Sequence, residues 1–373
     1  KIYRSITPLT GYQEVGSTEL TTFQDKNLKN ETSYYYKVAA LDLAGNESKL
    51  SDLTKATPVT PGPTSVKGMI LGEVTWYAGA SPYIIEGEVL VGPKAALTIE
   101  PGTIIRSKGE GISVLGKLIA KGDQTSLIGF ESVAPGQQWK GIIFNSTKNE
   151  DSTIEYTRIK GALTGITCLS SSPLISHNEI ANNQVGLQVS ESFSRPKILG
   201  NVIASNFSSG VEVSAAASPT LEENEICGNR QDGVFIREAQ PIMTKNWIHN
   251  NQEVGVRIFS SSFSLLNNNI HDNGKYDVYN DPQKDVKVEA NDNWWGTKEG
   301  LKIIGKIFGR VDYQRVLDAP YPQGKPVELP ILKGPLGGLV ERDSFLTLAH
   351  SPYVLEKDVR VEKGAILFIE PGV

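Results

Sequence analysis

The 373-residue sequence has little of several residue types on which common folds and functions depend. It contains two cysteines, two methionines and four histidines, and its 37 Lys and Arg residues are outnumbered by 42 Asp and Glu residues. Two cysteines cannot build a disulfide framework, and the absence of a CxxC pair argues against a zinc ribbon or a c-type haem. The net charge of −5 leaves no basic surface for nucleic acid or anionic lipid.

Long apolar runs are also missing. No stretch approaches the roughly 20 apolar residues of a membrane-spanning helix, and no signal peptide is recognisable. Gly, Asn, Ser and Thr are abundant while charged residues make up 21%, a balance that favours strands and turns over helical bundles. The length predicts about two or three domains.

Internal repetition dominates residues 66–318. Asn-x-Ile triplets begin at Asn178, Asn201, Asn224, Asn246 and Asn268, at spacings of 23, 23, 22 and 22 residues. Glycines follow the first four triplets at similar distances, at Gly186, Gly210, Gly233 and Gly255, and Gly165 follows the related Thr157-Arg-Ile159 in the same way. Thr157-Arg-Ile159 extends the series backward, and prolines stand before four of the triplets. Three markers in phase indicate a repeat architecture.

The residues after each glycine decide which repeat this is. Pairs such as Val211 and Val213 alternate at i and i+2, which predicts a short strand with one buried face. No helical spacing occurs within the period, so each period is predicted to be one coil of short strands. Coils stacked about 4.8 Å apart would form inward ladders of Ile, Val and Leu. The repeats resemble the right-handed parallel β-helix family of carbohydrate-binding and sugar-hydrolase type, and the handedness follows from that resemblance and the crossover rule.

Asparagines also form two columns in this alignment. The first holds Asn178, Asn201, Asn224, Asn246 and Asn268, and the second holds Asn183, Asn206, Asn229, Asn251 and Asn273. Asn291 or Asn293 would continue the first column. Stacked amides can hydrogen-bond from coil to coil, and we expect the same asparagines to adopt the left-handed backbone of sharp corners.

Residues 1–58 predict a small β unit. The strand in "ETSYYYKVAALD" would bury Tyr34, Tyr36, Val38 and Ala40 on one face. With Leu28 and Thr32 these residues resemble the second half of a fibronectin type III domain, in which Tyr34 would be the tyrosine corner, and "AGNES" is typical of bacterial versions. We expect a partial fibronectin type III β-sandwich, followed by an extended Thr/Pro linker at 59–65.

The last third repeats an earlier segment. Residues 351–372 match residues 81–102 at 12 of 22 positions without a gap, so 335–373 is predicted to begin a second β-helix after a linker at 319–334. Residues 98–130 resemble the first coils of β-helix family members, and a Trp-x-Gly-Ile-x-Phe strand follows. We interpret the chain as a piece of a longer polypeptide.

Trp294 and Trp295 stand where the regular repeats end. They could form a sugar-stacking platform, but similar β-helix modules often finish in Asn-Trp-Trp-Gly, so we favour an exit cap over the last coil at the end of the domain 66–318. Burial would contribute about 2–3 kcal/mol for each ring.

Enzymes of this family gather carboxylates, Arg, Lys or calcium on an outer face. His249 and His271 occupy equivalent positions, and Asp272 adjoins His271. Lys160, Ala181, Ala204 and Cys227 share their column, while Gln188, Glu212, Phe235 and Arg257 form a mixed outer surface. His249, His271 and Asp272 are therefore weak catalytic candidates. Cys168 is predicted to be buried, and Cys227 is placed in a turn too distant for a disulfide with it.

The sequence therefore predicts an all-β protein with a right-handed parallel β-helix between a partial fibronectin type III unit and the start of a second β-helix. We expect an extracellular or cell-surface structural module, such as a stalk, adhesin or fibre component, that contacts polysaccharide, copies of itself or other surface proteins. No cofactor is indicated, although the resemblance allows calcium. The alternatives are a lyase or hydrolase of acidic polysaccharide and a non-catalytic carbohydrate-binding module.

Overall fold

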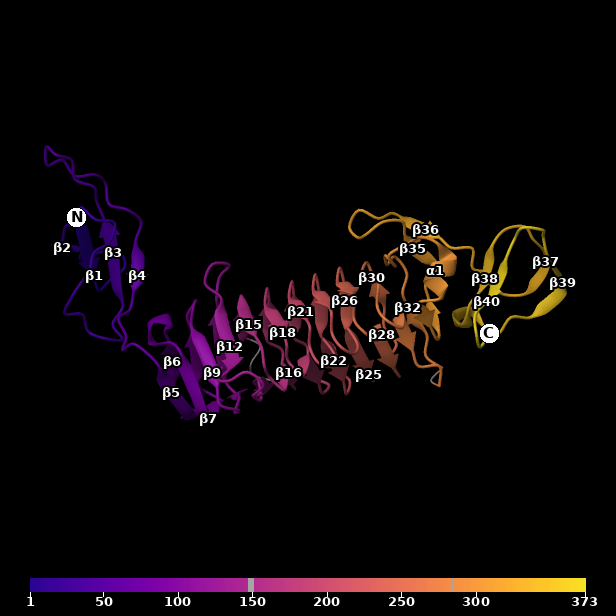
Figure 1. The fold of residues 1–373 in the computed structure, drawn as a ribbon, viewed down its shortest axis with the longest axis horizontal. Coiled ribbons are helices and arrows are strands. Elements are labelled where there is room, and N and C mark those ends of the chain that lie inside the picture. The colour runs from indigo at the N-terminus through magenta and orange to yellow at the C-terminus, as the bar shows by residue number, and fades with distance from the viewer. Residues whose placement is uncertain (147–150, 284) are drawn as a thin grey trace.

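The computed structural model of the chain describes residues 1–146, 151–283 and 285–373. Figure 1 shows an elongated rod of stacked strands, with a small antiparallel sheet at the N-terminal end and a separate group of strands at the C-terminal end. The protein is all-β and its body is a parallel β-solenoid, as the repeat predicts. No helix among these described residues is long or apolar enough to cross a membrane.

Each regular coil contributes one strand to each of three parallel sheets. We name them the triplet sheet, the post-glycine sheet and the post-proline sheet after the sequence markers that their strands carry or follow. The long strands β5 (Thr64–Ile70) and β7 (Tyr83–Val91) bend and belong to both of the first two sheets. Later coils use two separate strands instead.

The strands of these sheets are short, and each pairs in register with its equivalent in the next coil. The triplet sheet continues with β9 (Ile104–Ser107), β12 (Ile128–Ser132), β15 (Thr157–Ile159), β18 (Glu179–Ala181), β21 (Val202–Ala204), β24 (Glu225–Cys227), β27 (Trp247–His249) and β30 (Asn269–His271). The post-glycine sheet continues with β10 (Ile112–Val114), β13 (Ile142–Asn145), β16 (Thr164–Leu169), β19 (Val185–Ser190), β22 (Val211–Ser214), β25 (Val234–Arg237), β28 (Val254–Phe259), β31 (Tyr276–Asn280) and β33 (Ile307–Phe308). The post-proline sheet holds β6 (Glu73–Trp76), β8 (Ala96–Ile99), β11 (Lys117–Lys121), β14 (Thr153–Glu155), β17 (Leu174–Ser176), β20 (Lys197–Leu199), β23 (Thr220–Glu222), β26 (Ile242–Thr244) and β29 (Leu265–Leu266).

The core is a set of apolar columns inside these three sheets. The isoleucines of successive triplets face one another in register from Ile180 to Ile270, and all of them are fully buried. One continuous cluster of buried side chains runs from Trp76 to Phe345. Alternation along each strand therefore places one side chain in the core and the next on the surface, as the period-2 pattern predicts.

Both asparagine columns form buried hydrogen-bond ladders, which confirms the expected contacts. Asn224 shows the pattern: its Nδ2 donates to Asn246 Oδ1 (3.0 Å) and to the carbonyl of Ile198 (2.8 Å), while its Oδ1 accepts from the backbone N–H of Asn201 (3.0 Å). Asn293, not Asn291, continues this column, because Asn268 donates to Asn293 Oδ1.

The expectation that the ladder asparagines themselves adopt the left-handed backbone is wrong. Positive φ angles occur at the residue immediately before a ladder asparagine, as at His177 (φ 56°), Glu223 (φ 58°) and Asn250 (φ 55°). A left-handed residue turns the chain sharply, and the following asparagine then points inward, where its amide reaches the neighbouring coil. The ladder asparagines are therefore selected for hydrogen bonding and not for their own backbone conformation.

The repeated glycines mark the closest approach between coils. A Cβ built on Gly233 would lie 2.7 Å from the carbonyl oxygen of Gly255 and 2.8 Å from Asn251 Nδ2. The other four glycines of the column meet the next coil in the same way, with distances to its carbonyl oxygen between 2.4 and 2.7 Å. Steric exclusion by the neighbouring backbone therefore explains this column.

Residues 1–58 form one four-stranded antiparallel sheet in the order β2-β1-β3-β4. Its strands are β1 (Ile2–Ser5), β2 (Gln13–Gly16), β3 (Tyr34–Val38) and β4 (Thr54–Ala56). Tyr34 is buried, but Val38 and Ala40 are exposed and Ala39 is buried instead. The predicted alternation is wrong there because β3 ends at Val38, whose N–H is bonded by Ser51 Oγ. The solenoid begins at Thr64, two residues earlier than the predicted boundary.

The C-terminal end of the solenoid is irregular but continues beyond the tryptophan pair. It contains the short helix α1 (Gly300–Ile304), the parallel pair β32 (Val288–Glu289) and β34 (Val311–Asp312), and the antiparallel pair β35 (Arg315–Leu317) and β36 (Pro326–Glu328). The predicted linker 319–334 is therefore not a free tether, because it contains β36 and buries Leu329 and Ile331.

Residues 336–373 repeat the architecture of the first coils as well as their sequence. The parallel pairs β37 (Leu336–Val340) with β39 (Leu355–Val361), and β38 (Ser344–Leu346) with β40 (Leu367–Ile369), match β5 with β7 and β6 with β8. The 3₁₀ turns η1 (Ala78–Ala80) and η2 (Leu348–His350) also correspond. In each copy a tyrosine hydroxyl, of Tyr83 or Tyr353, accepts the N–H six residues earlier.

Candidate functional site

The structure separates the two tryptophans that the sequence treats as one feature. Trp295 is 4% exposed and belongs to the core cluster, so a bound sugar could not stack on its ring. Trp294 is half-buried and bridges to Asn269, which places it in the outward column that also holds Trp247. Helix α1 packs over the same end through the buried Ile303 and Ile304. Any glycan contact at this position would therefore involve Trp294 alone.

His249 and His271 lie side by side on the outer face of the triplet sheet. Their residues are register neighbours, and their rings stack with centroids 5.9 Å apart. Trp247 Nε1 donates to His271 Nε2 (3.0 Å), and His271 Nδ1 lies 2.7 Å from Asp272 Oδ2. Because an indole nitrogen can only donate, His271 carries its proton on Nδ1 and donates it to Asp272. Neither ring nitrogen of His271 is then open to a substrate, which argues against a catalytic role for His271.

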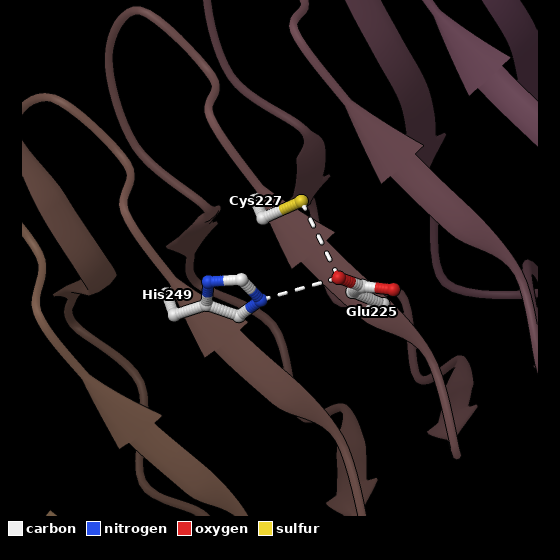
Figure 2. Close-up of side chains that lie close together, drawn as sticks. All are labelled: Glu225, Cys227 and His249. Carbon is white, nitrogen blue, oxygen red and sulfur yellow. Dashed lines mark hydrogen bonds and ion pairs between the residues drawn. The ribbon is translucent and has the colours of Figure 1, made fainter. Parts of the chain in front are cut away.

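Two further residues complete this group on the preceding strand. Glu225 Oε1 lies 3.3 Å from His249 Nε2 and accepts a longer contact of 3.8 Å from Cys227 Sγ (Figure 2). Glu225 and Cys227 are two residues apart on β24, so both point outward, and Cys227 pairs in register with His249 on β27. Cys227 was assigned to a turn from its position after Ile226; it is instead the last residue of a strand.

The chemistry of the two thiols follows from burial. Burial raises the pKa of Cys168 to about 12, and burial together with the charge of Glu225 raises the pKa of Cys227 to about 11. Both cysteines are free, as predicted, and Cys168 lies in the core. Since the thiolate is the nucleophilic form, neither residue is an activated nucleophile.

A groove of about 830 Å³ lies on the post-glycine sheet, on a different face from the histidine pair. Its floor contains Glu212, Phe235 and the ion pair between Asp232 and Arg257, which are joined by two hydrogen bonds of 2.7 and 3.0 Å. Burial raises the pKa of Glu212, and the nearby charge of Asp232 raises it further. Asp232 is itself buried and is paired with Arg257, and Glu253 at the edge of the groove is paired with Lys275, so Glu212 is the carboxyl group in this groove that is best placed to exchange a proton.

An outward row of aromatic rings continues from this groove along the post-glycine sheet. Ring centroids of Phe235 and Phe259 are 5.6 Å apart, those of Phe259 and Tyr279 are 6.3 Å apart, and Tyr279 stacks on Phe308 at 5.3 Å. The Arg237 guanidinium lies over both Phe235 and Phe259, at 5.3 and 5.5 Å from their centroids. Partly exposed rings beside arginines offer both stacking surfaces and charge.

Sequence reasoning named most of these residues but did not bring them together. The outward column of Glu212, Phe235 and Arg257 is confirmed by the strand register. The sequence did not predict the pairing of Arg257 with Asp232. Asp232 stands immediately before the repeated glycine Gly233 and therefore lies outside the strand that was aligned between coils. The sequence also did not predict that Glu225 lies close to His249. The signal was present, because Glu225 stands two residues before Cys227 on the same face of the strand, and Cys227 and His249 share a column.

Comparison with known proteins finds matches for parts of the chain and says little about its chemistry. A segment of "Protein bark beetle" from Drosophila melanogaster is 36% identical over 104 residues, covering 23% of this chain and 3% of that protein. The chain thus spans a very small part of the curated relative that it matches.

Solved structures of the periplasmic alginate epimerase AlgG are similar at low identity. One mutant of AlgG shares 13% identity at a TM-score of 0.40, over 81% of this chain and 76% of that chain. Another AlgG structure shares 14% identity at a TM-score of 0.35, over 80% and 73%. Residues 140–293 of the chain match the model of the right-handed β-helix region.

Proposed function

We propose that this chain is a rod-like structural segment of a larger extracellular or cell-surface protein, serving as a stalk, adhesin or fibre component. One observation carries the proposal. The isoleucine column and both asparagine ladders continue from coil to coil without a break, and a new set of the same first coils begins at the far end of the rod (Figure 1). Every coil adds backbone hydrogen bonds along one axis, which makes such a stack stiff.

The N-terminal sheet is consistent with a fibronectin type III unit on this rod. The hydroxyl of the buried Tyr34 accepts a hydrogen bond of 3.0 Å from the backbone N–H of Lys29, five residues earlier. A tyrosine that bonds back to nearby backbone is the corner feature of immunoglobulin-like sandwiches. Such modules are common in extracellular chains, and this supports the proposed location.

Electron microscopy of the purified chain tests the rod. We expect straight particles of constant width, with the antiparallel sheet visible at one end. Bent or globular particles with a joint inside residues 64–317 would refute a stiff spacer. Sedimentation velocity across a concentration series tests whether copies associate end to end, because heterologous contacts between repeating ends would lengthen the particles as concentration rises.

A second candidate function is binding of an acidic polysaccharide in the groove of the post-glycine sheet. Arg237 is exposed above Phe235 and Phe259, so a sugar carboxylate could pair with the guanidinium while the pyranose ring stacks on an aromatic face. From the groove the row of aromatic rings continues to Tyr279 across successive coils, as an extended chain would require. This arrangement favours a contact surface for a polyuronate over a neutral glycan.

Retention on immobilised alginate, pectate and dextran tests this candidate. The proposal predicts salt-sensitive retention on the two polyuronates, loss in Arg237→Ala and Phe259→Ala, and no change in the control Arg158→Ala, whose arginine lies on the triplet sheet beside Glu179. Equal retention of the variants would refute the groove. Release of unsaturated or shortened products would instead support the lyase or hydrolase alternative, and loss of that activity in Glu212→Gln or His271→Ala would identify the face that carries it.

A further inference from the structure

The triad on the triplet sheet has the composition and geometry of a metal site. Among the residues that the structure describes, the ligand atoms of Glu225, Cys227 and His249 all lie within 4.8 Å of one another (Figure 2). We propose that these three side chains bind a borderline-soft divalent cation, with Zn²⁺ as the best match. This site is independent of the proposed groove, which lies on another face.

Two of the three separations between the ligand atoms fit the edges of a coordination tetrahedron. Zinc bonds of roughly 2.1 Å to nitrogen or oxygen and 2.3 Å to sulfur give edges of about 3.4 Å between N and O and about 3.6 Å between S and O. His249 Nε2 and Glu225 Oε1 are 3.3 Å apart, and Cys227 Sγ and Glu225 Oε1 are 3.8 Å apart. The third separation, between the ligand atoms of Cys227 and His249, is within 4.8 Å, and side-chain rotations that bring it to about 3.6 Å would place a cation between the three atoms.

The backbone holds the donors in place before any cation arrives. Strands β24 and β27 are hydrogen-bonded neighbours, and their register sets Cys227 beside His249. The Trp247 ring packs against the His249 ring at 4.7 Å, and His271 stacks on it at 5.9 Å, so the imidazole is confined between them. The His249 side chain is 13% exposed, whereas that of Glu225 is 40% exposed. The site is therefore rigid on the inside and open to a fourth ligand from solvent.

Asn250 completes the arrangement around His249. Its side-chain amide lies 3.0 Å from His249 Nδ1. When Nε2 binds a cation, the imidazole proton moves to Nδ1, and a turn of the Asn250 amide presents its oxygen as the acceptor. Metal-bound histidines usually have such a partner, which fixes the ring and its tautomer. The thiol proton of Cys227 leaves to solvent as the S–metal bond forms.

The donor set selects the cation. One sulfur, one imidazole nitrogen and one carboxylate oxygen suit zinc, whereas calcium and magnesium prefer oxygen ligands only. The equivalent positions of the preceding coil hold Val202 and Ala204. That coil therefore cannot form a second copy, and the proposal predicts a single site.

Zinc titration of the whole chain, without a histidine tag and in competition with a chromogenic chelator, tests the proposal. We expect one equivalent of Zn²⁺ to bind, with no competition from Ca²⁺ or Mg²⁺. Cys227→Ala, His249→Gln and Glu225→Gln should each weaken binding at least tenfold. His177→Gln should leave it unchanged, because that exposed histidine lies on a distant coil.

Two measurements keep the test decisive. Ala204 and Ala181 already occupy the column of Cys227, so Cys227→Ala should fold, and an unchanged far-ultraviolet circular dichroism spectrum checks this. Co²⁺ in the site should give the visible bands of a tetrahedral ion and a sulfur-to-cobalt band that Cys227→Ala abolishes. Zinc binding of equal affinity in folded Cys227→Ala, or no binding by the unmodified chain, would overturn the proposal.

Discussion

Asp277 ends the second asparagine ladder, and its ionisation should destabilise the fold. Its Oδ1 accepts from both the backbone N–H and the Nδ2 of Asn273, at 3.2 and 2.9 Å. The side chain takes the place that an asparagine holds in every coil from Asn183 to Asn273. It is 2% exposed, and burial raises its pKa from 3.8 to about 6.

The direction of the dependence of stability on pH follows from proton binding by Asp277 in the folded and unfolded chains. Between pH 3.8 and about 6 the unfolded chain has released the Asp277 proton while the folded chain still holds it. Stability therefore falls as pH rises through this window, and the full contribution is present only below it. The shift is about two pKa units, so roughly 3 kcal/mol is lost by pH 8.

Asp277→Asn removes this loss while keeping an oxygen that can accept from Asn273. Equilibrium urea unfolding of the variant and the unmodified chain at pH 4 and pH 8, followed by tryptophan fluorescence, measures the effect. We expect the stability of the variant relative to the unmodified chain to increase by about 2.4 kcal/mol between the two pH values, because at pH 4 part of the unfolded chain has already released this proton. The new amide hydrogens could cost about 1 kcal/mol, but this cost is the same at both pH values and cancels.

A control at an exposed position separates burial from simple loss of charge. Asp52 is exposed in the N-terminal sheet, and Asp52→Asn changes the net charge of the chain by the same amount. If Asp277→Asn and Asp52→Asn show the same dependence on pH, the buried carboxyl of Asp277 is not the cause and the reasoning about the ladder end is wrong.

Three further substitutions, two of them with a control variant, test the coil architecture. Asn224→Ala should lower the free energy of unfolding by about 3–5 kcal/mol in urea titrations, because it leaves buried polar partners on two coils unsatisfied. The control Gln252→Ala, at an exposed position, should change the free energy of unfolding by less than about 0.5 kcal/mol. Gly233→Ala should reduce the thermal unfolding midpoint, since its methyl group would meet a carbonyl oxygen at 2.7 Å; an unchanged midpoint would show that the coils can separate. Trp295→Ala should cost about 3–5 kcal/mol and Trp294→Ala clearly less, and equal losses would contradict the different burial of the two rings.

The repeat made the coil predictable because each marker has one physical cause that recurs at every turn. Alternating Val and Ile residues report the two faces of a strand, and buried asparagines must find partners in the next coil. Column membership alone therefore placed His249 beside His271 and Phe235 beside Arg257, as the strand register confirms. The two cysteines were likewise placed too far apart for a disulfide, and both are free.

Contacts between residues of different columns could not be predicted from the repeat. The separation of Asp232 from Arg257 in sequence is 25 residues, and the separation of Glu225 from His249 is 24, whereas the strands themselves repeat at 22 in these coils. Such pairs depend on how long side chains lean along a strand and on the shape of the preceding corner. Only the three-dimensional structure supplies this information. The sequence therefore predicted neither the groove nor the group of Glu225, Cys227 and His249.

The two ladders also end by different means that a fixed period cannot predict. The first closes on Asn293, 25 residues after Asn268, and the Nδ2 of Asn293 then donates to the backbone carbonyls of Leu265 and Ala290. The second closes on Asp277, only four residues after its donor Asn273. A stack of amides needs an acceptor at its last member, and the chain supplies it from whichever segment lies there. The ends of a solenoid are therefore where sequence periodicity fails first, and where an ionisable group such as Asp277 can replace a neutral one.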